Sequence, residues 1–282
     1  EHWAGDLVAV QHHHAHIASC MADNGVGGPV IGVAFDGLGM GDDGELWGGE
    51  VLIATLSGYD RVASCKPVPL PGASAAIRHP WRMAAAFTDL AFGEQVPADL
   101  RVALDNAAGW AQVSRLSRAG APLNPPASSI GRLFDAVGAV VCRRYNASFE
   151  AQAAVDLEQL ADRAELSHYP HTWSEQSLRR LDTVAIFASV VEDLLRGTAP
   201  STVSARFHNT IARAISTICA NVRDQSGLAT VALSGGVFQN RLLTERSVSQ
   251  LHGLGFDVLT HRTVPANDGG ISLGQAVVAA AR

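Results

Sequence analysis

The stretch from Ala229 to His261, "ATVALSGGVFQNRLLTERSVSQLHGLGFDVLTH", decides the fold of this chain. A short apolar strand, "ATVALS", passes through two glycines into a helical pattern, "NRLLTERSVSQLHGLG", and the chain returns to a strand, "FDVLTH". A loop, "RTVPANDGG", and a further helix, "ISLGQAVVAAAR", follow. Strands that alternate with helices across glycine-rich turns are typical of a parallel sheet with crossover helices. The sequence therefore predicts an α/β protein.

The first sixty residues add a helix and a hairpin. "LVAV", Leu7 to Val10, predicts a short strand, and the pattern from Gln11 to about Asp23 predicts a helix. The apolar strands "VIGVAFDG" and "LWGGEVLIATL" are separated by a loop rich in Gly and Asp. Strand, glycine-rich turn and strand together indicate a β-hairpin.

The middle of the chain is helical. Apolar residues recur there at three- and four-residue intervals, as on one face of a helix. The segments with this pattern are "WRMAAAFTDLAF", "DLRVALDNAAGWAQVSRLSR", "IGRLFDAVGAVVC", "FEAQAAVDLEQLADRA", "VAIFASVVEDLLRG" and "SARFHNTIARAISTICANVRDQSG".

Composition narrows the class of protein. Hydrophobic residues make up 47% and charged residues 17% of 282, which is an ordinary globular balance. A net charge of −6 argues against a broad nucleic-acid surface. Four widely spaced cysteines without a CxxC pair predict reduced thiols in a cytoplasmic protein, and no apolar run approaches the roughly 20 residues of a membrane span. Because the first residues lack Met and lead at once into an apolar run, we expect a fragment of a longer protein.

The histidines of "VQHHHAHIAS" are the first candidate for chemistry. Residues four apart share one face of a helix, so His12 and His16 project together, whereas His13 and His14 point elsewhere. Such a pair is half of a site for Zn, Fe or a similar metal. A hydrogen-bonded or solvated histidine cluster explains the pair equally well, and a metal site needs carboxylates from elsewhere.

Two aspartates could complete that site. Asp36 ends a buried apolar strand, and Asp268 stands in "PANDGG" just before a helix. Asp36 could instead be a hairpin turn residue, and Asp268 a helix N-cap. Both acids lie at strand-to-loop junctions, where one site could collect them.

Glycine-rich turns suggest phosphate binding. In "LSGGVFQNR", Leu233 to Arg241, a strand stops, two glycines follow and a helix begins, an arrangement that brings backbone N–H groups close to an anion. The loop "DGLGMGDDG" could cradle a second phosphate with the help of a metal. There is no GxxxxGK[ST] motif and no obvious Ser-His-Asp or Cys-His nucleophile.

Taken in order, these blocks resemble one family. "VQHHHAHIAS", "VIGVAFDGLGMGDDGELWGGE", "PVPLPGASAAIRHPWRMA", "SSIGRLFDAVGAVV", "FEAQAAVDLE", "RFHNTIARAI", "LSGGVFQNRLL" and "VPANDGGISLGQAVVAAA" follow one another as in the carboxy-terminal, Kae1-like domain of the hydrogenase maturation carbamoyltransferases, HypF. The resemblance implies the α/β nucleotide-binding fold of actin, sugar kinases and Hsp70 (ASKHA). It further implies that residues 1–28 are the remnant of a truncated first lobe and residues 29–282 the second lobe, with a helical insertion at about 75–200.

The resemblance also implies site residues. In the family an HxxxH pair and two aspartates bind a divalent metal, Fe or Zn, which carries over to His12, His16, Asp36 and Asp268. The residues implied to bind the nucleotide are Ser234, Gly235, Gly236 and Asn240 in the SGGVxxN block, with Asp135 and Asp156 near the ribose.

The activity that the resemblance implies is carbamoyl transfer. Carbamoyl-adenylate, made from ATP and carbamoyl phosphate on an upstream domain, would donate its carbamoyl group to the carboxy-terminal cysteine of the partner maturation protein HypE, in the assembly of the cyanide ligands of [NiFe]-hydrogenase. One alternative is an O-carbamoyltransferase or a threonylcarbamoyl transferase of the same superfamily, but the "PWRMA" block favours the hydrogenase type over both. The other alternative is a nucleotide-binding fragment without catalysis. No membrane or nucleic-acid partner is expected.

Overall fold

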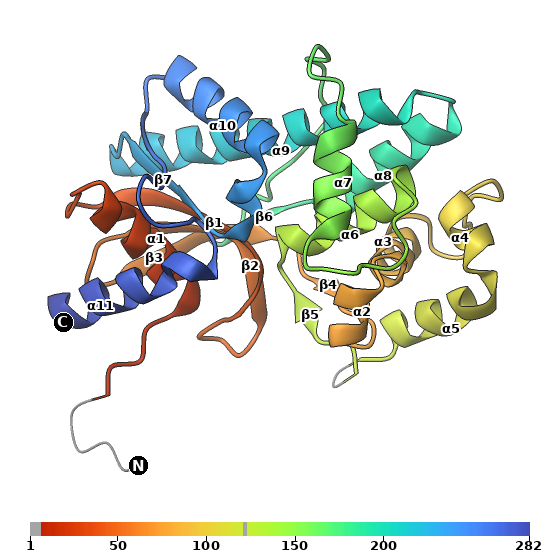
Figure 1. Ribbon diagram of the computed structural model, residues 1–282, viewed down its shortest axis with the longest axis horizontal. Helices are drawn as coiled ribbons and strands as arrows, with labels where there is room; N and C mark the ends of the chain where they lie inside the picture. Colours follow the sequence, from red (N-terminus) through yellow and green to blue (C-terminus); the bar gives the residue numbers. More distant parts are fainter. Residues whose placement is uncertain (1–6, 121–122) are drawn as a thin grey trace.

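A mixed sheet and a body of helices lie side by side in the structure, a computed structural model that describes residues 7–120 and 123–282 (Figure 1). The central strands run in the order β3-β2-β1-β7-β8. β1, β2 and β3 pair antiparallel, whereas β1, β7 and β8 pair parallel. Their bounds are β1 Val30–Met40, β2 Leu46–Ala54, β3 Tyr59–Cys65, β7 Thr230–Ser234 and β8 Asp257–Leu259.

Three short strands extend this sheet. β6 runs parallel to β3, and β5 pairs with β4 and with the start of β2 at Leu46. Their bounds are β4 Val68–Pro69, β5 Pro126–Ala127 and β6 Arg179–Leu181.

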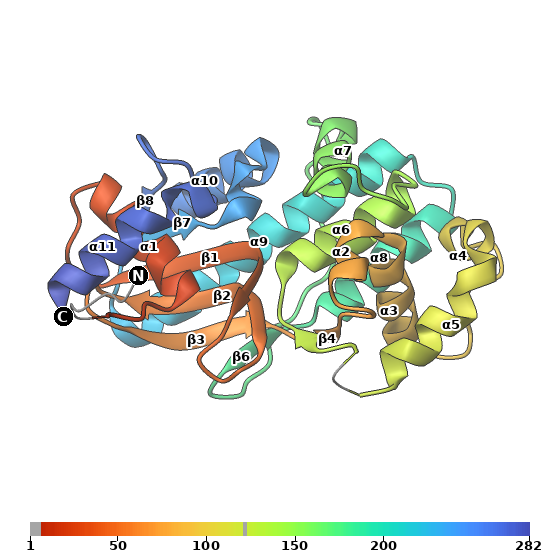
Figure 2. The same cartoon turned by 60° about the horizontal axis from the view of Figure 1, so that its bottom comes forward.

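The helices fall into two groups. α1 and α10 pack on the sheet and α11 packs on α1, while α2 to α8 gather beside the sheet and the long α9 runs from one group to the other (Figure 2). No helix among the described residues is both long and apolar enough to cross a membrane. The bounds are α1 His12–Asp23, α2 Ser74–Arg78, α3 Trp81–Phe92, α4 Arg101–Asp105, α5 Ala107–Arg118, α6 Ile130–Val141, α7 Gln152–Leu160, α8 Thr183–Leu195, α9 Pro200–Ser226, α10 Arg241–Gly253 and α11 Ile271–Ala281, with short 3₁₀ helices at Gly236–Gln239 (η1) and Asp268–Gly270 (η2).

The central strand β1 is buried on both faces. Val30 and Ala34 belong to a core cluster with α1, while Ile31, Val33 and Phe35 belong to the larger cluster that includes α9. Successive side chains of β1 point to opposite faces of the sheet, and each face is covered by helices. Both sets of side chains are therefore apolar, which explains why the strand is one continuous apolar run in the sequence.

α1 and α11 cross at very short range. A Cβ on Gly274 would stand 1.8 Å from the carbonyl oxygen of Ala15, so only glycine permits this approach. Beside the crossing, Ser19 Oγ donates to the carbonyl of Gly270 over 2.7 Å. The first helix is thus fixed against the loop that carries Asp268.

The hairpin, the parallel strands and most of the long helices predicted from the sequence are confirmed. The helix predicted over "DLRVALDNAAGWAQVSRLSR" is interrupted at Asn106, and that over "FEAQAAVDLEQLADRA" is shorter, Gln152–Leu160. The strand predicted at Leu7–Val10 is wrong: the segment has no regular structure, and Leu7 and Val8 are 90% and 42% exposed. Four apolar residues with no strand beside them gain no ladder hydrogen bonds.

Candidate metal and nucleotide site

His12, His16, Asp36 and Asp268 converge on one point. Each offers one ligand atom, and these atoms lie within 4.8 Å of one another. His12 Nε2 is 2.9 Å from Asp36 Oδ2, and His16 Nε2 is 3.3 Å from Asp268 Oδ1. The structure therefore brings together two histidines and two aspartates whose positions span almost the whole chain.

The electrostatics of this cluster suit a cation. Burial raises the pKa of Asp36, but the hydrogen bond with His12 and the nearby ring of His16 outweigh it and hold the pKa far below its usual range. Burial lowers the pKa of His12, and the bond and charge of Asp36 reverse this to a net rise. His16 Nε2 is buried and has no hydrogen-bond partner among the described residues. An orphaned imidazole nitrogen beside two carboxylates is the donor set that Zn²⁺ or Fe²⁺ prefers.

Local structure places each acid where it faces the histidines. Asp36 lies within β1, four residues before its end, so it is not the hairpin turn residue that was the alternative. The cap of η2 is Asn267, whose side chain accepts from Gly269 N over 3.0 Å. Asp268 is therefore free of the N-cap role, and its side chain, which is 72% exposed, places Oδ1 3.6 Å from His12 Nε2.

The neighbouring histidines are packing residues. His13 is fully buried against Trp47, and His14 is buried against Tyr59 with its Nε2 2.7 Å from the carbonyl of Thr55. Burial lowers the pKa of His13 to about 3, so this ring is neutral. The His13 ring packs edge-on against that of His12, with centroids 5.1 Å apart, but neither His13 nor His14 is among the four residues whose ligand atoms converge.

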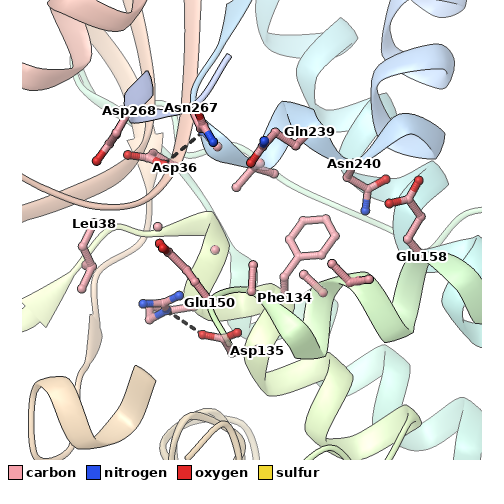
Figure 3. A pocket seen from close by; sticks show the side chains of 18 residues that line it. Asp36, Leu38, Phe134, Asp135, Glu150, Glu158, Gln239, Asn240, Asn267 and Asp268 are labelled. Atoms are coloured by element: carbon pink, nitrogen blue, oxygen red, sulfur yellow. Dashed lines mark hydrogen bonds and ion pairs between the residues drawn. The ribbon is translucent and has the colours of Figure 1, made fainter. Parts of the chain in front are cut away.

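A pocket of about 310 Å³ opens beside the cluster, between the sheet and the helical body (Figure 3). Asp36 and Asp268 form one wall, and Phe134, Asn240 and Glu158 lie across from them in Figure 3. A pocket of this size that adjoins convergent polar groups is the natural place for a ligand.

The end of β7 is held from two sides. Ser234 is buried, and its Oγ lies 2.8 Å from His261 Nε2, so it forms no part of the pocket lining. Gly235 follows with φ 103°, and a Cβ there would stand 2.1 Å from the carbonyl oxygen of Phe35. The sharp turn between β7 and η1 therefore requires glycine at this position.

Gly236 connects this loop to the cluster. Its backbone N–H donates to Asp36 Oδ1 over 3.1 Å, and the residue lines the pocket. The loop and the two-histidine cluster thus share one carboxylate.

Asn240 is fixed by contacts on both of its amide atoms. Its Oδ1 accepts from Leu243 N over 2.9 Å as the N-cap of α10, and its Nδ2 lies 2.9 Å from His208 Nε2. His208 is fully buried with its Nδ1 2.8 Å from the carbonyl of Ser204, which requires a proton on Nδ1 and leaves Nε2 as acceptor. The second N–H of the amide remains for the pocket that Asn240 lines.

The two acids implied for the ribose differ in position. Asp135 on α6 lines the pocket, and burial raises its pKa to about 6 despite Arg132 beside it. Asp156 on α7 lies outside the lining and accepts from Arg144 Nε over 2.6 Å. Glu158 lines the pocket instead, with its Oε1 3.1 Å from Leu242 N.

Sequence reasoning missed part of the lining. The spacing i, i+3, i+4, i+7 relates four residues at the N-cap and along α7, which therefore share one face of the helix. All four line the pocket: Ala151, Ala154, Val155 and Glu158. The other missed polar residues are Arg132, Glu150, Gln239 and Asn267.

Comparison with known proteins identifies the family of the chain. Residues 32–275 match the family described as "Carbamoyltransferase, Kae1-like Domain, second subdomain". The chain is 35% identical to carbamoyltransferase HypF2 of Cupriavidus necator over 99% of its length, and 38% identical to carbamoyltransferase HypF of Rhodobacter capsulatus over 98%. Among solved structures, full-length HypF in a phosphate- and nucleotide-bound form superposes with a TM-score of 0.86 at 39% identity, covering 98% of this chain and 43% of that one.

A second solved structure, HypF of T. kodakarensis, superposes with a TM-score of 0.85 at 28% identity, over 97% of this chain and 37% of that one. The chain spans 37% and 36% of the length of the two curated relatives above, and 71% of a shorter HypF homolog of C. necator, to which it is 37% identical. The chain belongs to the HypF carbamoyltransferase family, whose Kae1-like domain it matches.

Proposed function

We propose that this domain transfers a carbamoyl group from carbamoyl-adenylate to a cysteine thiol of a HypE-type partner in hydrogenase maturation. The observation that carries the proposal is the adjacency of the four-residue cluster and the pocket, joined by the bond from Gly236 N to Asp36 Oδ1. Membership of a carbamoyltransferase family and a nucleotide-bound HypF with the same fold support it.

The ASKHA assignment belongs to this proposal. Its support is the strand order β3-β2-β1-β7-β8, with three antiparallel strands followed by two parallel ones, and with the pocket-lining residues Asp36 within β1 and Gly236 just after β7. The division into residues 1–28 and 29–282, with an insertion at about 75–200, stays a prediction.

His12, His16, Asp36 and Asp268 would hold the divalent metal. A bound Fe²⁺ or Zn²⁺ would neutralise charge on the donor phosphate and polarise the carbamoyl carbonyl. Two imidazoles and two carboxylates suit either ion.

The proposed step exchanges one bond at the carbamoyl carbon. The partner's thiolate forms a C–S bond, the C–O bond to the phosphate breaks, and AMP leaves with the bonding electron pair, while the thiol proton passes to solvent before attack. In this chain, the fixed Asn240 amide and the amides that follow Gly235 would orient the nucleotide, and the pocket would hold the donor apart from bulk water.

Two other functions remain as alternatives to test. A hydroxyl or N6-adenine acceptor would make the domain an O-carbamoyl or threonylcarbamoyl transferase. A chain that binds nucleotide without turnover would be a binding module for the upstream domain that forms the adenylate.

The experiment supplies carbamoyl-adenylate to the purified chain with a peptide that ends in cysteine. Mass spectrometry should detect peptide carbamoylated on sulfur together with AMP. The same peptide ending in serine is the matched control and should stay unmodified. Release of AMP without acceptor modification in the presence of the cysteine peptide contradicts the proposal.

A further inference from the structure

Arg132 is a nearly buried cation with most of its donors unused. Its side chain is 7% exposed, and its one ion pair among the described residues places Nε 2.8 Å from Asp135 Oδ2, without hydrogen-bond geometry between the two atoms. Within residues 7–120 and 123–282, its two Nη groups donate to no protein atom, although the side chain lines the pocket. A guanidinium that is removed from water needs acceptors, and unsatisfied donors beside a pocket indicate a ligand with oxygens.

The charges of the residues that line the pocket also indicate that Arg132 binds an anion. Arg132 is the one cationic side chain in the lining, against five carboxyl groups, namely Asp36, Asp135, Glu150, Glu158 and Asp268. A phosphate that entered this pocket would meet repulsion from most of its wall. It needs a metal at one end and a second positive group at the other.

The fold places this guanidinium next to the cluster. The start of α6 packs on the end of β1 so closely that a Cβ on Gly131 would stand 3.0 Å from the carbonyl oxygen of Asp36. Ser129 caps α6 by accepting from Arg132 N over 3.2 Å. Arg132 Nη2 consequently lies 4.0 Å from the place that a Cβ on Gly37 would take, one residue beyond Asp36.

We propose that Arg132 is the anion receptor of the pocket and binds the phosphate of the donor through its free Nη groups. The inference rests on the proposed function for the identity of that phosphate, as part of a nucleotide. The receptor role itself requires only an oxyanion. The Asp135 ion pair keeps the guanidinium plane fixed, so that its fork meets two phosphate oxygens with little further loss of freedom.

The test titrates inorganic phosphate into the purified chain by calorimetry, with and without divalent metal. Wild type should bind phosphate, and Arg132→Gln should weaken that binding by about 10-fold or more, because a charge-assisted hydrogen bond contributes that much. The matched control is Arg144→Gln, since Arg144 also pairs with an aspartate at 2.6 Å but lies outside the lining. This control should keep the wild-type affinity for phosphate.

Two further variants separate recognition from folding. Arg132→Gln/Asp135→Asn removes both buried charges and should lose phosphate binding in the same way, whereas Asp135→Asn alone keeps the guanidinium and should retain it. Phosphate affinity that is equal in wild type and Arg132→Gln, or absent from wild type, overturns the receptor role.

A second titration compares AMP with adenosine. Arg132→Gln should abolish the preference for AMP and leave the affinity for adenosine unchanged. If phosphate binds through Arg132 but neither AMP nor adenosine binds, the proposed function fails while the receptor role stands.

Discussion

Asp36 and Gly236 are joined by a 3.1 Å hydrogen bond from the glycine N–H to Oδ1 of the aspartate, across 200 residues of sequence. The other oxygen of the same carboxylate, Oδ2, faces His12 and His16 at 2.9 and 3.5 Å. One side chain therefore sets the orientation of the histidine cluster and of the turn after β7.

The purified chain should contain about one divalent metal ion. The double substitution His12→Ala/His16→Ala removes half of the donors in the cluster, and we expect metal content by mass spectrometry to fall to background. Affinity should drop by more than the roughly 10–100-fold typical for loss of an outer-sphere partner. Asp268→Ala should behave in the same way.

The control for metal content is His252→Ala, an exposed histidine at the end of α10. It should leave the metal content unchanged. Equal metal in the double variant and in wild type would contradict the assignment of the ligands.

Gly274→Ala should separate the first and last helices. Its Cβ would meet the backbone carbonyl of Ala15, which has no rotamer to adjust, so α11 must shift. We expect a loss of about 1–3 kcal/mol in the free energy of unfolding, as for other overpacked contacts, together with weaker metal binding. Gly253→Ala on α10, where a Cβ meets nothing within 4 Å, should change stability by less than about 1 kcal/mol. Denaturant unfolding of both variants is the measurement, and equal stabilities would count against the close crossing.

Acid should destabilise the protein through His208. Burial lowers the pKa of His208 to about 4, so between its usual value of 6.5 and 4 the unfolded chain binds a proton that the folded chain does not. The free energy of unfolding must therefore fall as the pH falls through this window, by about 2 kcal/mol between pH 7 and pH 5.

Urea unfolding at the two pH values measures this effect as a difference between variants. His208→Gln should be less stable at pH 7 but should lose less stability on acidification than wild type. Other buried histidines such as His13 contribute equally to both proteins and cancel. Identical pH slopes would show that His208 does not stay neutral in the folded state.

Arg61→Met should be strongly destabilising. Glu50 is fully buried, and Arg61 Nε lies 2.7 Å from its Oε2, so the substitution leaves a buried carboxylate without its cation. We expect a loss of about 3–5 kcal/mol, most of it recovered in Arg61→Met/Glu50→Gln. Lys66→Met, which removes an exposed pair 3.9 Å from Asp182, should cost less than about 1 kcal/mol. Chemical denaturation of wild type and the three variants is the measurement, and a small effect of Arg61→Met alone would refute the prediction.

Sequence periodicity predicted the elements well where one face of an element is buried. α3 begins and ends at Trp81 and Phe92, as its pattern predicts, and β7 and β8 pair in parallel. Periodicity fails at Leu7–Val10, because a strand depends on a partner that a local pattern does not reveal.

The histidine pair could be predicted from a four-residue spacing, and the two aspartates from their place at strand ends and from the family resemblance. The structure shows that these four side chains meet, whereas their role as metal ligands stays a prediction.

Arg132 could not be predicted as a pocket residue in this way. Every residue of α6 from Ile130 to Val141 is buried, so no amphipathic stripe tells which face lines a cavity. Asp156 and Glu158 are two positions apart on a helix, and only the tertiary packing of α7 decides which of them reaches the pocket.

The contact between Ser19 and Gly270, 251 residues apart, governs when the cluster can form during synthesis. A ribosome that has made α1 and the hairpin holds three of the four converging side chains, and Asp268 emerges only with the final helix. Until then, His12, His16 and Asp36 lack the fourth member of the cluster. The four side chains of the cluster thus come together only after η2 and α11 have been made, through closure of a very long loop rather than through local folding.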